Sequence, residues 1–178
     1  MTQLEPIRDD ALRWARASGT QLRSALGKVD VELKGEIDLV TDADRSSEAF
    51  LVEKIRAAYP EHGIWAEEGS AEPADCDWRW IIDPLDGTTN FAHQIPHFAT
   101  LLAVQRRGES GFETVVAVCY DPMREESFDA IQAAGARCNG VAIRVSAVSR
   151  LIESTGATGF PYDRWENEHD NHAEFCAL

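Results

Sequence analysis

Apolar residues in the first third of the chain recur three and four positions apart, which is the spacing of one face of a helix. This pattern predicts a helix over residues 4–26, with Gly27 as its C-terminal stop, and a second helix over residues 41–59, ended by Pro60. Between the two helices, residues 29–33 alternate apolar and charged side chains, which is the period of a half-buried strand. The pattern therefore predicts a helix, a strand and a second helix in this order.

The middle of the chain consists of apolar stretches separated by short turn-forming segments. A short strand is expected at residues 62–66, and the apolar run 78–82 is expected to form a buried strand that ends at Asp83. Three more strands are predicted at residues 98–107, 112–120 and 124–132, and a further alternation follows the Asn139-Gly140 turn signal. Strands joined by short connections pair antiparallel. We therefore expect an α/β (α+β) fold with a large antiparallel sheet, in one compact domain over residues 1–178.

The residues most suited to catalysis lie at the end of this buried strand and just after it, in the segment Ile81-Ile82-Asp83-Pro84-Leu85-Asp86-Gly87-Thr88-Thr89-Asn90-Phe91. Asp83 and Asp86 are three residues apart, and two such carboxylates repel each other unless one is protonated or a cation lies between them. Gly87 allows the backbone to come close to a ligand. The Thr and Asn residues that follow suit the start of a helix, where free N–H groups attract anions. Carboxylates beside an anion-binding helix start are what divalent-cation phosphoryl chemistry requires, whereas a structural Asx turn is the simpler alternative.

The nine residues Asp83-Pro84-Leu85-Asp86-Gly87-Thr88-Thr89-Asn90-Phe91 resemble the signature of the inositol monophosphatase family of Mg²⁺-dependent sugar-phosphate phosphatases. The resemblance implies a layered αβαβα sandwich. It also implies hydrolysis of a phosphate monoester of a small polyol, with inositol monophosphate as the first candidate and Mg²⁺ as the cofactor. The implied metal ligands are Glu67, which is the first of two adjacent acids, Asp83, Asp86 and the carbonyl of Leu85.

The same resemblance implies a catalytic pair and a substrate site. Taken alone, Asp44 is an ordinary first-turn acid that complements the helix dipole, and Asp42 keeps that interpretation. The family has a similar Val-Thr-x-x-Asp segment, so Asp44 is expected to hold Thr88 while the two residues orient the attacking water and accept its proton. The resemblance also implies which residues contact the substrate. They are Glu67 and four residues of the signature, Leu85, Asp86, Gly87 and Thr88.

Three alternatives stay open at this point. A sister phosphatase would act on histidinol phosphate, fructose bisphosphate or a 3′-phosphonucleotide, and would differ in a substrate rim that includes Gly159 and Phe160. The His93-x-x-Pro96-His97-Phe98 stretch favours the inositol branch weakly. After the inositol phosphatase and the sister phosphatase, a noncatalytic fragment or paralogue is the third alternative. The family's later Trp-Asp-x-Ala-Ala-Gly segment, which supplies another acid to the metals, has no counterpart here, so the chain is expected to be truncated at its C-terminus. We expect uncovered apolar surface and little turnover, unless Asp163 or Asp170 replaces the missing acid.

The amino-acid composition limits the classes of molecule that the chain is expected to bind. The 178 residues include 31 acidic and 17 basic side chains, for a formal charge of −14. Such a surface argues against binding to nucleic acid or an anionic membrane, and a phosphate substrate then needs metal ions that reverse the field locally. The four cysteines show no Cys-x-x-Cys spacing, which suits reduced thiols in a cytoplasmic protein. A homodimer is expected. His169 and His172 have a spacing compatible with a metal, but a solvated helix face is favoured.

Overall fold

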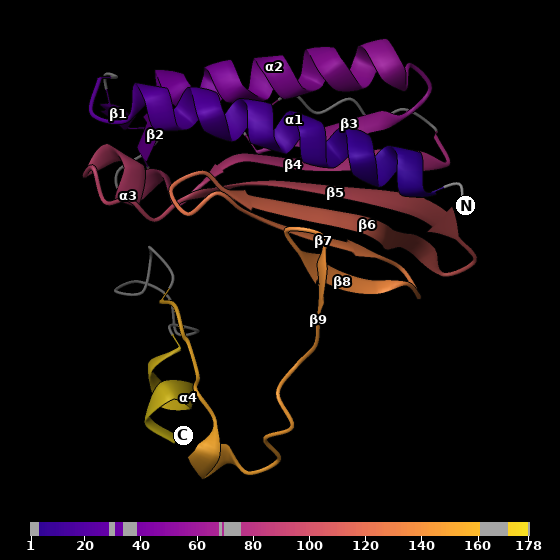
Figure 1. Ribbon diagram of the computed structural model, residues 1–178. Coiled ribbons are helices and arrows are strands. Elements are labelled where there is room, and N and C mark those ends of the chain that lie inside the picture. Colours follow the sequence, from indigo (N-terminus) through magenta and orange to yellow (C-terminus); the bar gives the residue numbers. More distant parts are fainter. Residues whose placement is uncertain are drawn as a thin grey trace.

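Two long helices lie side by side across one face of a large sheet (Figure 1). The computed structural model describes residues 4–28, 31–33, 39–67, 69, 76–160 and 171–177. Helix α1 (Leu4–Ala25) packs on the middle of the sheet, and helix α2 (Asp42–Ala58) packs against α1 and strand β4 (Trp78–Asp86). Both helices place an apolar stripe against the sheet, which explains why their period could be read from the sequence.

The large sheet has seven strands in the order β3-β4-β5-β6-β7-β8-β9. Its other strands are β3 (Gly63–Ala66), β5 (Ala99–Gly108), β6 (Gly111–Asp121), β7 (Glu126–Ile131), β8 (Gly135–Cys138) and β9 (Val141–Ile143). Strand β3 pairs with β4 in parallel, and every later pair is antiparallel. The predicted antiparallel sheet is therefore confirmed, with one parallel strand at its edge.

The remaining elements are short. Strands β1 (Val31–Leu33) and β2 (Leu39–Thr41) form a two-stranded antiparallel sheet. Helix α3 (Thr88–Ala92) follows β4, and a 3₁₀ turn at Leu151–Glu153 and helix α4 (His172–Ala177) follow the large sheet. Among the described residues, no helix is both long and apolar enough to cross a bilayer. All four cysteines are free thiols.

The core fills the space between the two long helices and the sheet. Trp14 of α1 lies 5.6 Å from Trp80 of β4, ring centre to ring centre, and Trp80 is fully buried. The indole N–H of Trp80 donates to Nδ1 of His62 at 3.0 Å, and the imidazole stacks between the rings of Tyr59 and Trp78. Nearer the N-terminus of α1, Arg8 contacts the buried Asp129 of β7 at 3.0 Å. These contacts fix the helices on the sheet and so position the end of β4.

Three predicted boundaries are wrong for local reasons. The strand expected to end at Asp83 continues through Pro84 to Asp86, because a bulge accommodates the proline inside the strand. Arg124 lies in a turn rather than a strand, since the Asp121 side chain accepts its backbone N–H at 3.0 Å. The alternation after Asn139-Gly140 ends at Ile143, and Val145 is 96% exposed. The helix expected from about residue 165 is described only as α4, because residues 161–170 lie outside the described part.

Candidate active site

The site forms where two parallel strands end beside each other. Ala66 at the end of β3 is paired with Ile82 of β4, and the backbone N–H of Glu67 donates to the Ile82 carbonyl at 3.2 Å. Glu67 and Asp83, the residues that follow this last parallel pair, therefore lie at the same level of the sheet. Parallel pairing of β3 with β4 is what brings these two acids together from positions sixteen residues apart in the sequence.

A bulge then brings the second acid of the signature into the same region. Asp83 is paired with Leu101 of β5, and Asp86 is paired with Ala99, so two residues of β4 lie opposite one residue of β5. Pro84 cannot donate a backbone hydrogen bond to the ladder, which suits it to such a position. The extra residue changes the direction of the strand and places Asp86 at its exposed end.

Asp83 is affected by its burial and by the two neighbouring acids. Burial first, and then the charge and hydrogen bond of Glu67 and the charge of Asp86, raise the pKa of Asp83 to about 8. The Oδ1 atom of Asp83 is buried and has no hydrogen-bond partner among the described residues. A buried carboxylate oxygen that lacks a donor and faces other acids is stable only when it is protonated or when a cation approaches it.

These residues fit a hard divalent cation. Glu67, Asp83, Asp86 and the carbonyl of Leu85 are all oxygen donors, which Mg²⁺ prefers. Within the part of the chain that the structure describes, no three His, Cys, Asp or Glu side chains form a preassembled ligand cluster. The structure thus brings the predicted acids to one strand end, with Asp86 and Glu67 exposed and Asp83 half-buried. Their role as ligands remains a prediction.

Thr88 and Asp44 come together as the sequence predicted, from elements that are far apart in the chain. Asp44 lies in the first turn of α2 and is 1% exposed, which is unusual for an acid whose only role is to complement a helix dipole. The Oγ1 atom of Thr88 lies 3.1 Å from Asp44 Oδ1 and 3.0 Å from the carbonyl oxygen of Leu85. A hydroxyl has one proton, so Thr88 donates to one of these oxygens at a time. Asp42, by contrast, is exposed and pairs with Arg45 at 3.3 Å.

Gly87 connects the strand to helix α3 in a conformation that a side chain would disturb. Its φ angle is +90°, in the left-handed region, and a Cβ atom there would lie 3.0 Å from the carbonyl oxygen of His97. That same carbonyl accepts a hydrogen bond from the Asn90 side chain at 2.8 Å. The glycine therefore allows the chain after Asp86 to pass close to residues 97 and 98, whereas the close approach predicted from the sequence was that of the backbone to a ligand.

Two hydroxyls near the site could not be recognised from the sequence as functional. Ser47 on α2 and Thr100 on β5 are both buried, and both donate to the carbonyl of Pro84. Their only signal in the sequence is a polar residue at a position that the helix or strand period assigns to the core. Other predicted residues lie elsewhere or are not described: Phe160 packs against His172 and Phe175 of α4, while Glu68, His169, Asp163 and Asp170 lie outside the described residues.

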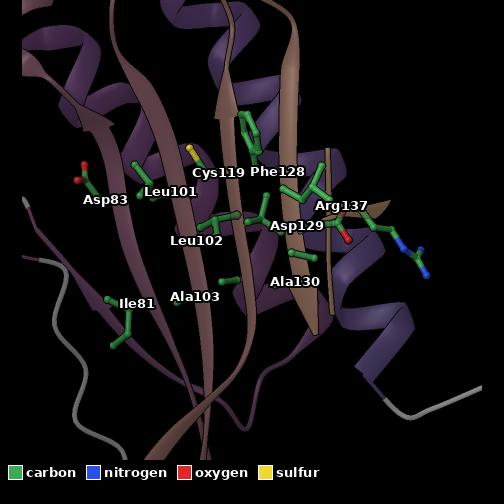
Figure 2. Close-up of a pocket in the computed structure, with 14 residues that line it drawn as sticks. Ile81, Asp83, Leu101, Leu102, Ala103, Cys119, Phe128, Asp129, Ala130 and Arg137 are labelled. Carbon is green, nitrogen blue, oxygen red and sulfur yellow. The ribbon is translucent and has the colours of Figure 1, made fainter. Parts of the chain in front are cut away.

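An apolar hollow of about 370 Å³ lies on the sheet face opposite the two long helices, and Asp83 is at its margin (Figure 2). Asp83, Leu101, Cys119 and Phe128 are paired in register across four strands, so their side chains share this face. Alanine, leucine, isoleucine, valine and phenylalanine side chains make up most of the lining. Such a surface does not suit a phosphorylated polyol, and the chemistry is therefore assigned to the acidic strand end rather than to the hollow.

Comparison with curated proteins finds relatives of similar sequence. The chain is 44% identical over 163 residues to a Vibrio cholerae protein named Nus factor SuhB, and 42% identical over 163 residues to the Escherichia coli K12 protein of the same name. Each comparison covers 89% of this chain and 60% of the relative. The chain thus spans about three fifths of the length of these curated relatives.

Solved structures and a sequence profile give the same result. An inositol monophosphatase from Anabaena (Nostoc) sp. PCC 7120 is 39% identical and superimposes with a TM-score of 0.84, over 98% of this chain and 63% of the other. An IMPase/NADP phosphatase complexed with Mg²⁺ and phosphate is 26% identical, with a TM-score of 0.70 over 79% of this chain and 53% of the other. The profile of the inositol monophosphatase family matches residues 3–178. This chain belongs to the inositol monophosphatase family.

Proposed function

We propose that this chain carries the metal-binding and water-orienting residues of a Mg²⁺-dependent phosphatase. The substrate is a phosphate monoester of a small polyol, with inositol monophosphate as the first candidate. One observation carries the proposal. The hydroxyl of Thr88 lies 3.1 Å from the buried carboxylate of Asp44, beside a strand end where Asp83 keeps a buried oxygen without a donor.

The acids at the strand end would hold the cation. Glu67, Asp83, Asp86 and the carbonyl of Leu85 are the groups that would coordinate it. A bound divalent cation supplies a nucleophile by lowering the pKa of its water, and it stabilises negative charge on the phosphoryl group. The chain needs such a charge, because its formal charge of −14 would otherwise repel a phosphate.

The Thr88–Asp44 pair would orient the attacking water. When Thr88 donates its proton to Asp44, the lone pairs of its oxygen face outward as acceptors, and a water that donates to them is held in one orientation. The water would give its proton to the Thr88 oxygen as Thr88 passes its own proton to the buried Asp44 carboxylate. Thr88 alone is too weak a base for this step. The backbone N–H groups of Gly87 and Thr88 are the expected contact for phosphate oxygens, because they lie at the start of helix α3 and Gly87 has no side chain to obstruct a ligand.

The relatives support the class of reaction more firmly than the substrate. One similar structure is named an inositol monophosphatase and another an IMPase/NADP phosphatase with Mg²⁺ and phosphate bound. The second name keeps a sister phosphatase of different specificity open as an alternative. A homodimer remains a prediction.

The curated relatives favour a second candidate, which is a noncatalytic role. Their name, Nus factor SuhB, is not the name of a hydrolase. This name does not test the expectation that the chain binds no nucleic acid, which stays a prediction. A role of this kind would persist when Thr88→Ala removes the proposed water-orienting hydroxyl, whereas phosphatase activity would not.

Phosphate release from a panel of sugar phosphates tests the proposal. The assay is run with and without Mg²⁺, on residues 1–178 and on a chain extended at its C-terminus by the corresponding part of a relative. We expect Mg²⁺-dependent release in the extended chain, loss of it in Asp83→Asn, and retention in Asp42→Asn, a matched change at an exposed acid of the same region. Release that is independent of Mg²⁺, or equal in the two variants, would overturn the proposal.

A further inference from the structure

The bulge in β4 creates a buried carbonyl that the sheet does not use. The ladder between β4 and β5 is interrupted between Asp83 and Asp86, and Pro84 lies in the interruption. Pro84 is buried, and its carbonyl oxygen faces groups of α2 and β5. A buried carbonyl with no donor is costly, so this peptide keeps its orientation only where donors are supplied.

Two buried hydroxyls supply those donors from opposite sides. Ser47 Oγ of α2 donates to the Pro84 oxygen at 3.1 Å, and Thr100 Oγ1 of β5 donates to it at 3.2 Å. Ser47 is 1% exposed and Thr100 is fully buried. With both lone pairs of the carbonyl occupied, the peptide plane between Pro84 and Leu85 cannot rotate without breaking a hydrogen bond.

A third hydroxyl, that of Ser18, lies behind Ser47. Ser18 Oγ of α1 lies 2.5 Å from Ser47 Oγ, and Ser18 is fully buried. Because the single proton of Ser47 is directed to the Pro84 carbonyl, Ser18 is the donor in the contact between the two serines. A directed chain of hydroxyls therefore runs from α1 through α2 to the peptide in the bulge.

This peptide stands between the two acids of the signature. A rotation of the Pro84–Leu85 peptide would move Asp83 relative to Asp86, and it would also move the Leu85 carbonyl. We propose that Ser47 and Thr100, with Ser18 behind Ser47, are positioning residues. They hold the Pro84 carbonyl so that Asp83 and Asp86 keep the separation that a divalent cation requires. This inference rests on the proposed function of the acidic site.

Mg²⁺ binding to the 178-residue chain, measured by isothermal titration calorimetry, tests the inference without an activity assay. Ser47→Ala and Thr100→Val each remove one donor to the Pro84 carbonyl with little change of volume. Groups that orient metal ligands typically change metal affinity by about 10–100-fold when they are removed. We therefore expect each single variant to weaken Mg²⁺ binding about tenfold, and Thr100→Ser, which keeps a hydroxyl, to restore it.

A matched control separates positioning from stability. Ser127 of β7 is also 1% exposed and accepts a hydrogen bond from Arg16 at 2.8 Å, on a strand three positions away from β4. Ser127→Ala should lower the melting temperature and leave the Mg²⁺ affinity unchanged. In the metal-free protein, the ¹⁵N chemical shift of the Leu85 amide, whose nitrogen is bonded to the Pro84 carbonyl carbon, should change in Thr100→Val but not in Ser127→Ala.

The outcomes distinguish this inference from the function on which it rests. Tight Mg²⁺ binding by the wild type and by both Ser47→Ala and Thr100→Val, with reduced melting temperatures only, would overturn the positioning role and leave the metal site standing. A wild-type chain that gives no Mg²⁺ isotherm would overturn the metal site, and the positioning role with it. Weakened binding in both variants and recovery in Thr100→Ser would support the inference.

Discussion

Replacing Asp83 by Asn should stabilise the metal-free protein while it removes Mg²⁺ binding. Asn has nearly the shape of Asp without the charge, and its amide can still donate to Glu67. In the folded protein, burial and the neighbouring acids raise the pKa of Asp83 from 3.8 to about 8. In the unfolded chain the same carboxyl ionises near its ordinary pKa. The folded state therefore carries a penalty for the charged form that the variant does not have.

The sign and size of this effect follow from proton linkage. Between about pH 4 and about pH 8 the folded state binds the proton that the unfolded state has lost, so the free energy of unfolding falls as the pH rises through that window. At about 1.36 kcal/mol for each pKa unit, the shift corresponds to an upper limit of roughly 6 kcal/mol. The side chain is partly exposed and solvent screens its charge, so we expect a gain of about 2 kcal/mol in Asp83→Asn near pH 8.

Thermal denaturation followed by circular dichroism measures the gain. In a chain of this size, about 1 kcal/mol changes the melting temperature by roughly 2–4 °C. With EDTA present, Asp83→Asn should thus melt about 4–8 °C higher than the wild type near pH 8, and at about the same temperature near pH 4. Mg²⁺ should raise the melting temperature of the wild type only.

The exposed acid Glu109, in the β5–β6 turn, provides the control. Glu109→Gln should leave both the pH dependence and the response to Mg²⁺ as they are in the wild type. A lower melting temperature of Asp83→Asn in EDTA near pH 8 would refute the reasoning, because it would show that the ionised side chain stabilises the fold. A Mg²⁺ response that persists in the variant would show that Asp83 is not a ligand.

Three other predictions follow from the same geometry. Thr88→Ala and Asp44→Asn should each lower the turnover of an active, extended chain by about 10²–10⁴-fold, with little change in KM. The double variant should be little worse than either single variant, because the two residues act as a unit, and multiplicative losses in steady-state kinetics would show independent roles. Burial lowers the pKa of His62, and its Nδ1 accepts an indole N–H, so the free energy of unfolding should fall as the pH drops from about 7 to about 5. Urea denaturation of His62→Phe should show a smaller dependence of the unfolding free energy on pH, and an unchanged dependence would contradict this prediction. Gly87→Ala should cost about 1–3 kcal/mol in urea denaturation, because φ is +90° and the new Cβ would meet the His97 carbonyl at 3.0 Å; an unchanged midpoint would contradict this strain.

The regular elements could be predicted because burial repeats with a fixed period. In α1, the residues that the helical spacing selects, such as Ile7, Ala11 and Trp14, are buried against the sheet. The turn between β8 and β9 was predicted from Asn139-Gly140, although strand β8 before it was not, and both turn residues have positive φ angles, 48° and 80°, as a tight type I′ turn requires. In these places the local pattern and the tertiary structure demand the same residues.

The site could be predicted only in part, because its geometry depends on long-range pairing. The signature from Asp83 to Phe91 identified the acids and Thr88, but nothing near residue 67 in the sequence indicates that β3 pairs in parallel with β4. The bulge was also missed. A proline after an apolar run is typical of a strand end, but here it lies inside β4, where Ser47 and Thr100 donate to its carbonyl from other elements.

The end of β4 concentrates exceptions to the rules that the rest of the strand obeys. Trp80 and Ile82 are buried apolar residues in regular register. Within the next four residues the strand contains a buried carboxylate oxygen without a donor, an internal proline and a bulge, and it leads into a glycine with positive φ. Each feature is unfavourable alone, and folds keep such features mainly where a function requires them. Buried hydroxyls from α2 and β5 stabilise the interruption instead of a regular ladder, and this feature of the structure supports, apart from any relative, the proposal that the functional site lies at this strand end.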